Sequence, residues 1–228
     1  MINFLRKMAS KLPVRYQQEM KRINFKRRLQ KGKFQSNEPE FGLLGKWVKE
    51  GDLVIDIGAN VGHYTHRLSS LVGVTGRVLA FEPVPETFEL LSSNLNKLPY
   101  QNMTLFNVAV FNKTDFIGMR IPSFHTGLKN YYRAQLDTES NDLKVLSIAL
   151  DCLCLPKPVK LVKIDVEGQE LAVLQGMKGI LQKDRPLLII EDNTLEIDHF
   201  LNSLNYIHFQ LPDSPNRIFH HKEISISL

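Results

Sequence analysis

The sequence predicts an α/β fold in which a doubly wound, largely parallel sheet carries helices on both faces. Short apolar runs alternate with helical patterns from residue 40 onward, most of these runs are apolar throughout, and a glycine-rich turn follows the first of them. Continuous apolar runs are typical of parallel strands covered on both faces, and alternation of strands with helices is typical of doubly wound sheets. Together these observations make a doubly wound α/β sheet the expected architecture.

The elements can be placed along the chain by their apolar patterns. Strands are predicted at 53–57, 77–82, 104–108, 159–165 and 187–191. Helices are predicted at 61–71, 85–97, 170–182 and 193–204. Two β-like segments, 206–210 and 216–220, flank a loop with two prolines and predict a terminal hairpin. The polar segment 111–150 interrupts the alternation, and we interpret it as an inserted hairpin or lid.

Length and composition are those of a globular chain. It has 228 residues, 43% hydrophobic and 23% charged, which fits one domain with an extension. No apolar run approaches the roughly 20 residues that span a bilayer, and residues 1–10 lack the apolar core of a secretory signal. Cys152 and Cys154 would point to opposite faces of an extended segment, so a disulfide framework is not expected. We therefore expect a cytoplasmic protein, with peripheral membrane association as the alternative.

Charge divides the chain into a basic arm, residues 1–37, and an acidic domain, residues 38–228. The first 33 residues contain 11 of the 29 Lys and Arg but one of the 24 acids, so they carry +10 and the remainder −5. Apolar residues at spacings of three and four predict an amphipathic helix in the arm: Ile2, Leu5, Met8, Leu12, Tyr16, Met20 and Ile23.

Three roles for this arm stay open at the level of sequence. The helix could pack on its own domain with its charges in water. It could instead contact a membrane surface or a protein through residues 1–33. Nucleic-acid binding is the least favoured of the three, because aromatic residues do not alternate with the bases to form a stacking platform.

The glycine-rich turn after the first strand carries the strongest signal for a ligand. Asp56 precedes Gly58, and Asn60 and Gly62 complete the turn before a predicted helix. Glycine permits a tight turn and close approach, and the helix N-terminus offers unpaired N–H groups. The dinucleotide fingerprint G-x-G-x-x-G fits poorly, since Asn60 stands at the middle glycine. At the end of the second strand, Glu82 is positioned to accept hydrogen bonds from ribose hydroxyls.

A second cluster of charge lies at the end of the fourth strand. Lys163 and Asp165 are two residues apart and share one face of a strand that we expect to be buried. A buried lysine needs a partner, so Asp165, Glu167 or Glu191 should neutralise it. The cluster is either an ion pair that holds the sheet together or a group that meets the reacting part of a substrate.

Five motifs in this order resemble the FkbM family of S-adenosylmethionine-dependent methyltransferases. They are Asp-Ile-Gly-Ala-Asn-Val-Gly at 56–62, Phe-Glu-Pro at 81–83, Asn-Val-Ala-Val at 107–110, Lys-Ile-Asp-Val-Glu-Gly-Gln-Glu at 163–170 and Arg-Pro-Leu-Leu-Ile-Ile-Glu at 185–191. The similarity covers about residues 38–192. It implies the seven-stranded, Rossmann-like methyltransferase sheet with an antiparallel last strand pair. It also implies methyl transfer to a hydroxyl of a sugar, polyketide or other small metabolite, with S-adenosyl-L-methionine as cofactor.

The resemblance assigns roles to individual residues. It implies that the cofactor contacts Glu40, Asp56, Gly58, Asn60, Gly62, Glu82, Asn107 and Ala109. Within this set Glu82 takes the ribose, Asn107 and Ala109 flank the adenine, and Glu40 reaches the amino group unless it is a solvated acid. Asp165, supported by Glu167, is implied to orient or deprotonate the acceptor hydroxyl, and His125 in the inserted segment is a rival base.

Other functions compete with methyl transfer. A nicotinamide-dependent dehydrogenase would share the fold class, but it should show a better glycine fingerprint. A non-catalytic protein could bind nucleic acid or a membrane surface through the arm. No zinc or non-haem iron ligand spacing is present, so we predict no resident metal, and magnesium at Asp165 with Glu191 or Asp192 is the alternative.

Overall fold

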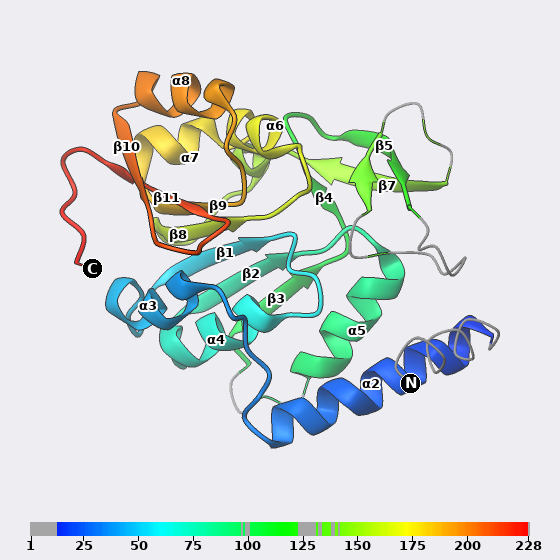
Figure 1. Ribbon diagram of the computed structural model, residues 1–228. Coiled ribbons are helices and arrows are strands. Elements are labelled where there is room, and N and C mark those ends of the chain that lie inside the picture. Colours follow the sequence, from blue (N-terminus) through cyan, green and yellow to red (C-terminus); the bar gives the residue numbers. More distant parts are fainter. Residues whose placement is uncertain are drawn as a thin grey trace.

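The computed structural model describes residues 13–96, 98, 101–122, 131, 134–137, 140 and 142–227. Its main sheet has seven strands in the order β10-β11-β9-β8-β1-β2-β3 (Figure 1). These strands are β1 (Leu53–Ile57), β2 (Arg77–Phe81), β3 (Met103–Phe106), β8 (Val159–Ile164), β9 (Leu187–Ile190), β10 (Tyr206–Gln210) and β11 (Arg217–His221). The first five are mutually parallel, and β11 runs antiparallel to both β9 and β10. The predicted α/β class and its antiparallel last pair are confirmed.

Helices cover both faces of this sheet (Figure 1). One layer contains α3 (Pro39–Trp47), α4 (His63–Val72) and α5 (Pro85–Leu95), and the other contains α6 (Glu170–Gln175), α7 (Lys178–Lys183) and α8 (Leu195–Ser203). Every residue of β1 and β9 is buried, which explains why these strands are apolar without alternation.

The single helix predicted at 170–182 is divided into α6 and α7. Two tertiary contacts cause the break at Gly176. A Cβ at this position would lie 2.0 Å from the carbonyl oxygen of Phe111, so only glycine allows the approach. The Gly176 carbonyl accepts a hydrogen bond from Asp151 N at 3.0 Å, and the Asp151 carboxylate caps the first turn of α7 through Gly179 N and Ile180 N.

The inserted segment, together with the two residues that precede it, forms a second, four-stranded sheet in the order β4-β7-β5-β6. Its strands are β4 (Ala109–Val110), β5 (Asp115–Arg120), β6 (Gln135–Leu136) and β7 (Leu143–Ile148). β5 and β7 pair antiparallel, and β4 joins β7 in parallel directly after β3. The buried side chains of this sheet cluster with Val84, at the start of α5. A lid function for 111–150 stays a prediction.

In the basic arm, α2 (Val14–Gln30) packs along α5 (Figure 1). Phe25 is buried in a cluster with Phe34, Leu90 of α5 and Val61 of the glycine-rich turn. The Arg22 guanidinium forms an ion pair with Glu89 of α5 at 3.0 Å. The arm therefore rests on the α/β domain, and its first 12 residues lie outside the described residues.

Two sequence features that were used to predict the cellular compartment, the cysteines and the apolar segments, can be compared with the structure. Cys152 and Cys154 are free and exposed, but they lie in and after the 3₁₀ turn η2 (Leu150–Cys152), so their placement on a strand was wrong. The turn forms because Leu153 N donates back to Leu150 O and Asp151 is held by Gly176. Across the described ranges, no helix combines the length and apolar character needed to cross a membrane.

Candidate active site

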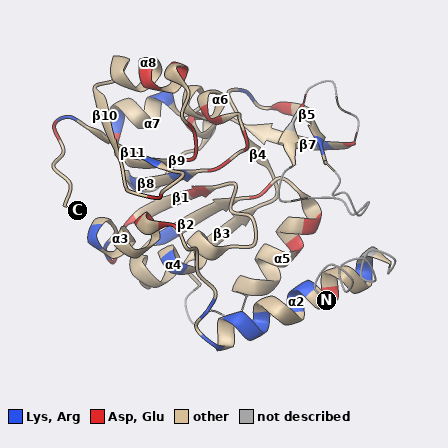
Figure 2. Ribbon diagram, in the orientation of Figure 1, with Lys and Arg blue, Asp and Glu red and all other residues tan. Residues whose placement is uncertain are grey.

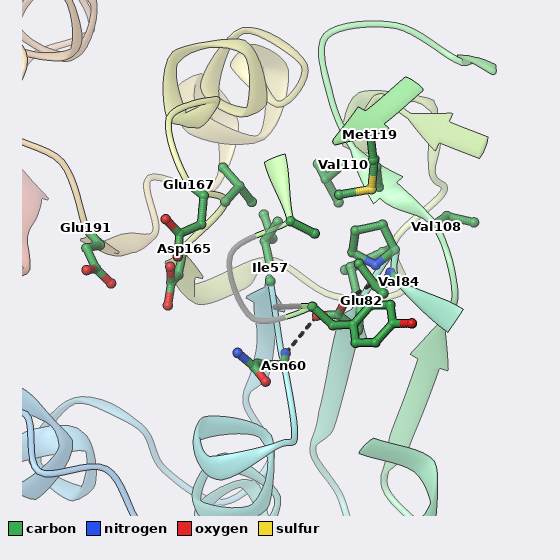
Figure 3. Close-up of a pocket in the computed structure, with 17 residues that line it drawn as sticks. Ile57, Asn60, Glu82, Val84, Val108, Val110, Met119, Asp165, Glu167 and Glu191 are labelled. Carbon is green, nitrogen blue, oxygen red and sulfur yellow. Dashed lines mark hydrogen bonds between the residues drawn. The ribbon is translucent and has the colours of Figure 1, made fainter. Parts of the chain in front are cut away.

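A cavity opens where the carboxyl ends of β1, β2 and β8 meet the second sheet. Figure 3 shows its two chemically different sides, with Asp165, Glu167 and Glu191 on one side and Val84, Val108, Val110 and Met119 on the other. Glu82 and Asn60 lie between them, joined by a hydrogen bond. The cavity therefore combines an acidic side with an apolar side around one central carboxylate.

The turn between β1 and α4 forms the floor of the cavity. Gly58 N and Ala59 N both donate to Phe81 O at 2.9 Å, which ties the turn to β2. Gly58 has φ +76°, and a Cβ there would lie 1.8 Å from Asp165 O. Asn60 and Gly62 also have positive φ, at 52° and 96°. Glycine at position 58 thus allows β1 and β8 to approach each other directly beneath the acidic side.

Glu82 follows β2 and is held by two backbone donors. Its Oε2 accepts from Asn60 N at 3.0 Å, and its Oε1 accepts from Val84 N at 2.9 Å. The side chain is buried, and this burial, reinforced by Asp165 and Asp56, raises its pKa to about 7 against the two stabilising hydrogen bonds. A carboxylate has about four lone-pair sites, so two acceptor positions remain for a ligand.

A second acceptor at this point is the side-chain oxygen of Asn60. Asn60 Oδ1 is buried and has no hydrogen-bond partner within the described part of the chain, although Asn60 lines the cavity. Buried polar atoms in folded proteins are almost always paired. Asn60 Oδ1 is therefore a position at which a donor group of a ligand would be stabilised.

The acidic side is built on a buried ion pair. Lys163 on β8 is 2% exposed, and its Nζ lies 3.5 Å from Asp165 Oδ2 and 3.3 Å from Asn216 Oδ1. The expectation that an acid neutralises Lys163 is confirmed, and Asp165 is that acid. Lys163 also pairs in register with Asp56 of β1. Burial raises the pKa of Asp56 to about 6, while the hydrogen bond from Thr65 and the charge of Lys163 oppose that shift.

Glu191 and Glu167 complete the acidic side from neighbouring segments. Glu191 follows β9 and is exposed to solvent. Partial desolvation and then the charge of Asp165 raise its pKa to about 7, against the effect of Lys163. Glu167 has φ +55°, an uncommon conformation for a residue with a side chain. The loop around it is held by Glu170 Oε1, which accepts from Val166 N and Gly168 N. Strained backbone of this kind is concentrated at functional sites.

Glu40 lies next to the cavity in a buried hydrogen-bond network. It is 0% exposed, so the alternative of a solvated acid is wrong. Its carboxylate accepts from Ser214 Oγ at 2.7 Å, from Asn216 Nδ2, and from Tyr64 Oη at 3.2 Å. Burial and, after it, the negative charges of Glu38 and Glu40 raise the pKa of Tyr64 far above its usual value. The Tyr64 hydroxyl therefore keeps its proton and donates it in hydrogen bonds. The network connects α3 with the terminal hairpin and, through Asn216, with Lys163.

The structure brings six of the predicted site residues to the cavity wall: Gly58, Asn60, Glu82, Ala109, Asp165 and Glu167. Four others are not among the residues that line it: Glu40, Asp56, Gly62 and Asn107. Asn107 Nδ2 donates to the carbonyls of Glu82 and Pro83, so it shapes the chain after β2. His125 lies outside the described residues. No group of three or more His, Cys, Asp or Glu in the described ranges is placed to hold a metal ion.

Sequence reasoning did not assign several cavity residues to the site. Val84, Met119 and Tyr131 line the cavity because the second sheet folds against the start of α5, a contact between distant segments. The sequence indicated Glu191 as a partner of Lys163 or as a magnesium ligand, but not as a base. It had a usable signal, since like Glu82 and Asp165 it is an acid that ends a predicted parallel strand.

The sheet order, the glycine-rich turn and the acid after β2 define a Rossmann-like methyltransferase fold. Residues 56–208 match the model of the methyltransferase FkbM domain. The chain belongs to this family of S-adenosylmethionine-dependent methyltransferases, as its five motifs indicated.

Individual relatives agree with this assignment. The hexuronic acid methyltransferase AglP of Haloferax volcanii is 33% identical over 144 residues, a match that covers 61% of this chain and 56% of that protein. The chain therefore spans about half the length of that relative. The crystal structure of methyltransferase FkbM from Methylobacillus flagellatus superposes with a TM-score of 0.57 at 16% identity, covering 75% of this chain and 44% of that one. A putative rRNA methylase from Clostridium thermocellum gives a TM-score of 0.50 at 17% identity, covering 78% and 89%. At these identities the two structures support the fold alone.

Proposed function

We propose that this protein transfers a methyl group from S-adenosyl-L-methionine to a hydroxyl oxygen of a small acceptor. The observation that carries the proposal is the position of Glu82, a buried carboxylate with two free acceptor sites between an apolar and an acidic side. Such an acid after the second strand is suited to a ribose. A ligand with an aromatic base, a ribose and a cationic end matches, in that order, the apolar side, Glu82 and the acidic side of the cavity.

The residues present fit this cofactor part by part. Val84, Val108 and Ala109 offer an apolar surface to the adenine, and Glu82 accepts from the ribose hydroxyls. The cationic end would lie toward Asp165, with Asn60 Oδ1 as a further acceptor for its N–H groups. Asp56 and Gly62 act indirectly. Asp56 Oδ2 accepts a hydrogen bond from Thr65 Oγ1 at 2.5 Å, which fixes the first turn of α4, and Gly62 directly precedes that helix.

When bound, S-adenosyl-L-methionine supplies an electrophilic methyl group, so the protein mainly has to position the acceptor oxygen and remove its proton. Asp165 is restrained by Lys163 and would orient the hydroxyl by accepting its hydrogen bond, with Glu167 in support. Glu191 is positioned as a proton acceptor near neutral pH, because partial desolvation and the charge of Asp165 raise its pKa to about 7. The base expected from sequence, Asp165, thus shares its role with Glu191, which follows the neighbouring strand β9.

The acceptor that the acidic side favours is a neutral hydroxylated molecule, and we place a sugar first. The named relative acts on a hexuronic acid, which places sugars among the acceptors to test. Here, however, Asp165, Glu167 and Glu191 face the acceptor side and Lys163 is already paired with Asp165. A carboxylate on the acceptor would be repelled there, so a neutral sugar should react faster than the matching uronic acid.

Two measurements test this function. Calorimetry should show binding of S-adenosyl-L-methionine and no comparable binding of NADH or NADPH, and Glu82→Ala should weaken it by about 1.5–3 kcal/mol, the value of hydrogen bonds to a charged group. Mass spectrometry of a reaction with paired neutral and uronic sugars should then show a gain of one methyl group. Unchanged affinity in Glu82→Ala, or preference for a nicotinamide cofactor, would contradict the proposal.

A further inference from the structure

The helix α2 has apolar side chains on two opposite faces, and the domain covers one of them. The inward face contributes Gln18 and Phe25, both 8% exposed, and half-buried Leu29. On the outward face Tyr16, Met20 and Ile23 form a row at spacings of four and three. Their exposed fractions are 60%, 47% and 44%. The sequence pattern identified this outward row. The described part of the domain leaves Tyr16 and Met20 uncovered, and Ile23 borders a groove that Asn94 of α5 also lines.

Basic side chains lie along one edge and at the end of the outward row, whereas its other edge carries Gln17 and Asn24. Arg27 continues it by one further turn, and Arg15, Lys26 and Arg27 are all exposed. Glu19 is the one acid between Val14 and Gln30. Figure 2 shows Lys and Arg at intervals along α2, whereas acidic residues gather at the ends of the central strands. The outward surface of α2 is therefore apolar along its centre and positive along one edge and at its C-terminal end.

We propose that α2 lies on an anionic lipid surface, with Tyr16, Met20 and Ile23 inserted at the level of the headgroups and Lys26 and Arg27 against lipid phosphates and carboxylates. An exposed apolar row edged by bases is the pattern of helices that lie in the membrane interface. Nucleic acid would need the bases but has no use for a central apolar row. The interaction goes beyond methyl transfer and does not depend on it.

The contacts of α2 place this surface near the cavity. Glu86 of α5 acts on the charge of Lys21, Glu89 pairs with Arg22, and Leu90 packs with Phe25, so α2 and α5 run in the same direction. The first turns of α2 therefore lie beside the N-terminal end of α5, and this end directly follows Val84 of the cavity wall. Glu86 also forms a hydrogen bond with Tyr131, another cavity residue. A membrane beneath α2 would lie beside the cavity end of α5.

Co-sedimentation of the full chain with vesicles tests the proposal. We expect binding to phosphatidylcholine vesicles that contain phosphatidylserine, release when salt is raised from about 0.05 to about 0.5 M, and little binding to phosphatidylcholine alone. Lys26→Gln with Arg27→Gln should weaken the partition about fivefold for each base removed. Met20→Ser with Ile23→Ser should weaken it at least about tenfold.

A matched control removes two exposed apolar residues elsewhere. Leu195 and Ile207 are 72% and 40% exposed and lie on α8 and β10, so Leu195→Ser with Ile207→Ser should bind as the unaltered chain does. Circular dichroism and thermal unfolding establish that each variant is folded. Absence of sedimentation, equal binding to neutral vesicles, or unchanged binding of the Met20 and Ile23 variant would each overturn the proposal. Binding to duplex DNA that survives the apolar substitutions would assign the arm to nucleic acid instead.

Discussion

The affinity for S-adenosyl-L-methionine should depend on pH through Glu82. In the ligand-free protein its pKa is raised to about 7, chiefly because the carboxylate is buried. In the proposed complex ribose hydroxyls would donate to the charged form, so the cofactor would bind the deprotonated protein and protonation would compete with it. Affinity should therefore be nearly constant above about pH 8 and fall as the pH drops through 7.

The size of the effect follows from that pKa. At about pH 8 roughly one molecule in ten carries the proton, so binding is barely affected, whereas at about pH 6 roughly nine in ten carry it. The apparent dissociation constant should rise roughly tenfold between these values, or about 1.4 kcal/mol. Calorimetric titrations at several pH values measure this change, and the proton released on binding can be counted from its dependence on buffer ionisation enthalpy.

The variant Glu82→Gln separates this group from its neighbours. The amide keeps the shape but cannot titrate, and its NH₂ must face either Asn60 N or Val84 N, so affinity falls at every pH. The remaining affinity should not change between about pH 6 and 8. Asp56 and Glu191 also have raised pKa values, so a slope that persists in Glu82→Gln would assign the effect to them and refute the reasoning. A flat profile for the unaltered protein would refute it as well.

Three further substitutions test other parts of the structure. Gly58→Ala should lower the free energy of unfolding by about 1–3 kcal/mol more than Gly32→Ala does. Both glycines have positive φ, but only a Cβ at position 58 would collide with backbone atoms. Denaturant unfolding measures the difference. Glu191→Gln should lower kcat roughly 10² to 10⁴-fold with little change in cofactor affinity. It should also remove the increase of the rate with pH near 7. A variant that reacts as fast as the unaltered protein would exclude Glu191 as the base. Phe25→Ala should cost about 3 kcal/mol and expose α2 to proteolysis, which limited digestion followed by mass spectrometry would detect.

Much of the main sheet could be predicted because its signals are local. The continuous apolar runs place β1 at the predicted residues and the other four parallel strands within one or two, and the acids after β2 and β8 lie at the cavity as expected. Burial of Lys163 beside Asp165 could also be predicted, since it follows from strand periodicity and the cost of an unpaired charge.

The remaining features depend on contacts between distant segments. The order of the second sheet rests on pairings such as Ala109 with Ser147, which no local pattern specifies. The break at Gly176 is caused by Phe111, 65 residues earlier in the chain. Spacing along α2 identified an apolar row, but it could not show that the domain would pack against the opposite face through Phe25.

The second sheet has a consequence for how long a ligand stays bound. Val84, Ala109 and Met119 belong both to the cavity wall and to the core formed by Ile117 and Val145. Local opening of β5 and β7 would therefore remove one side of the cavity without unfolding the main sheet. The hydrogen-exchange protection of these strands and the dissociation rate of the cofactor should then change together. Substitutions at Ile117 or Val145, which do not line the cavity, would shorten the residence time of a ligand that they never touch.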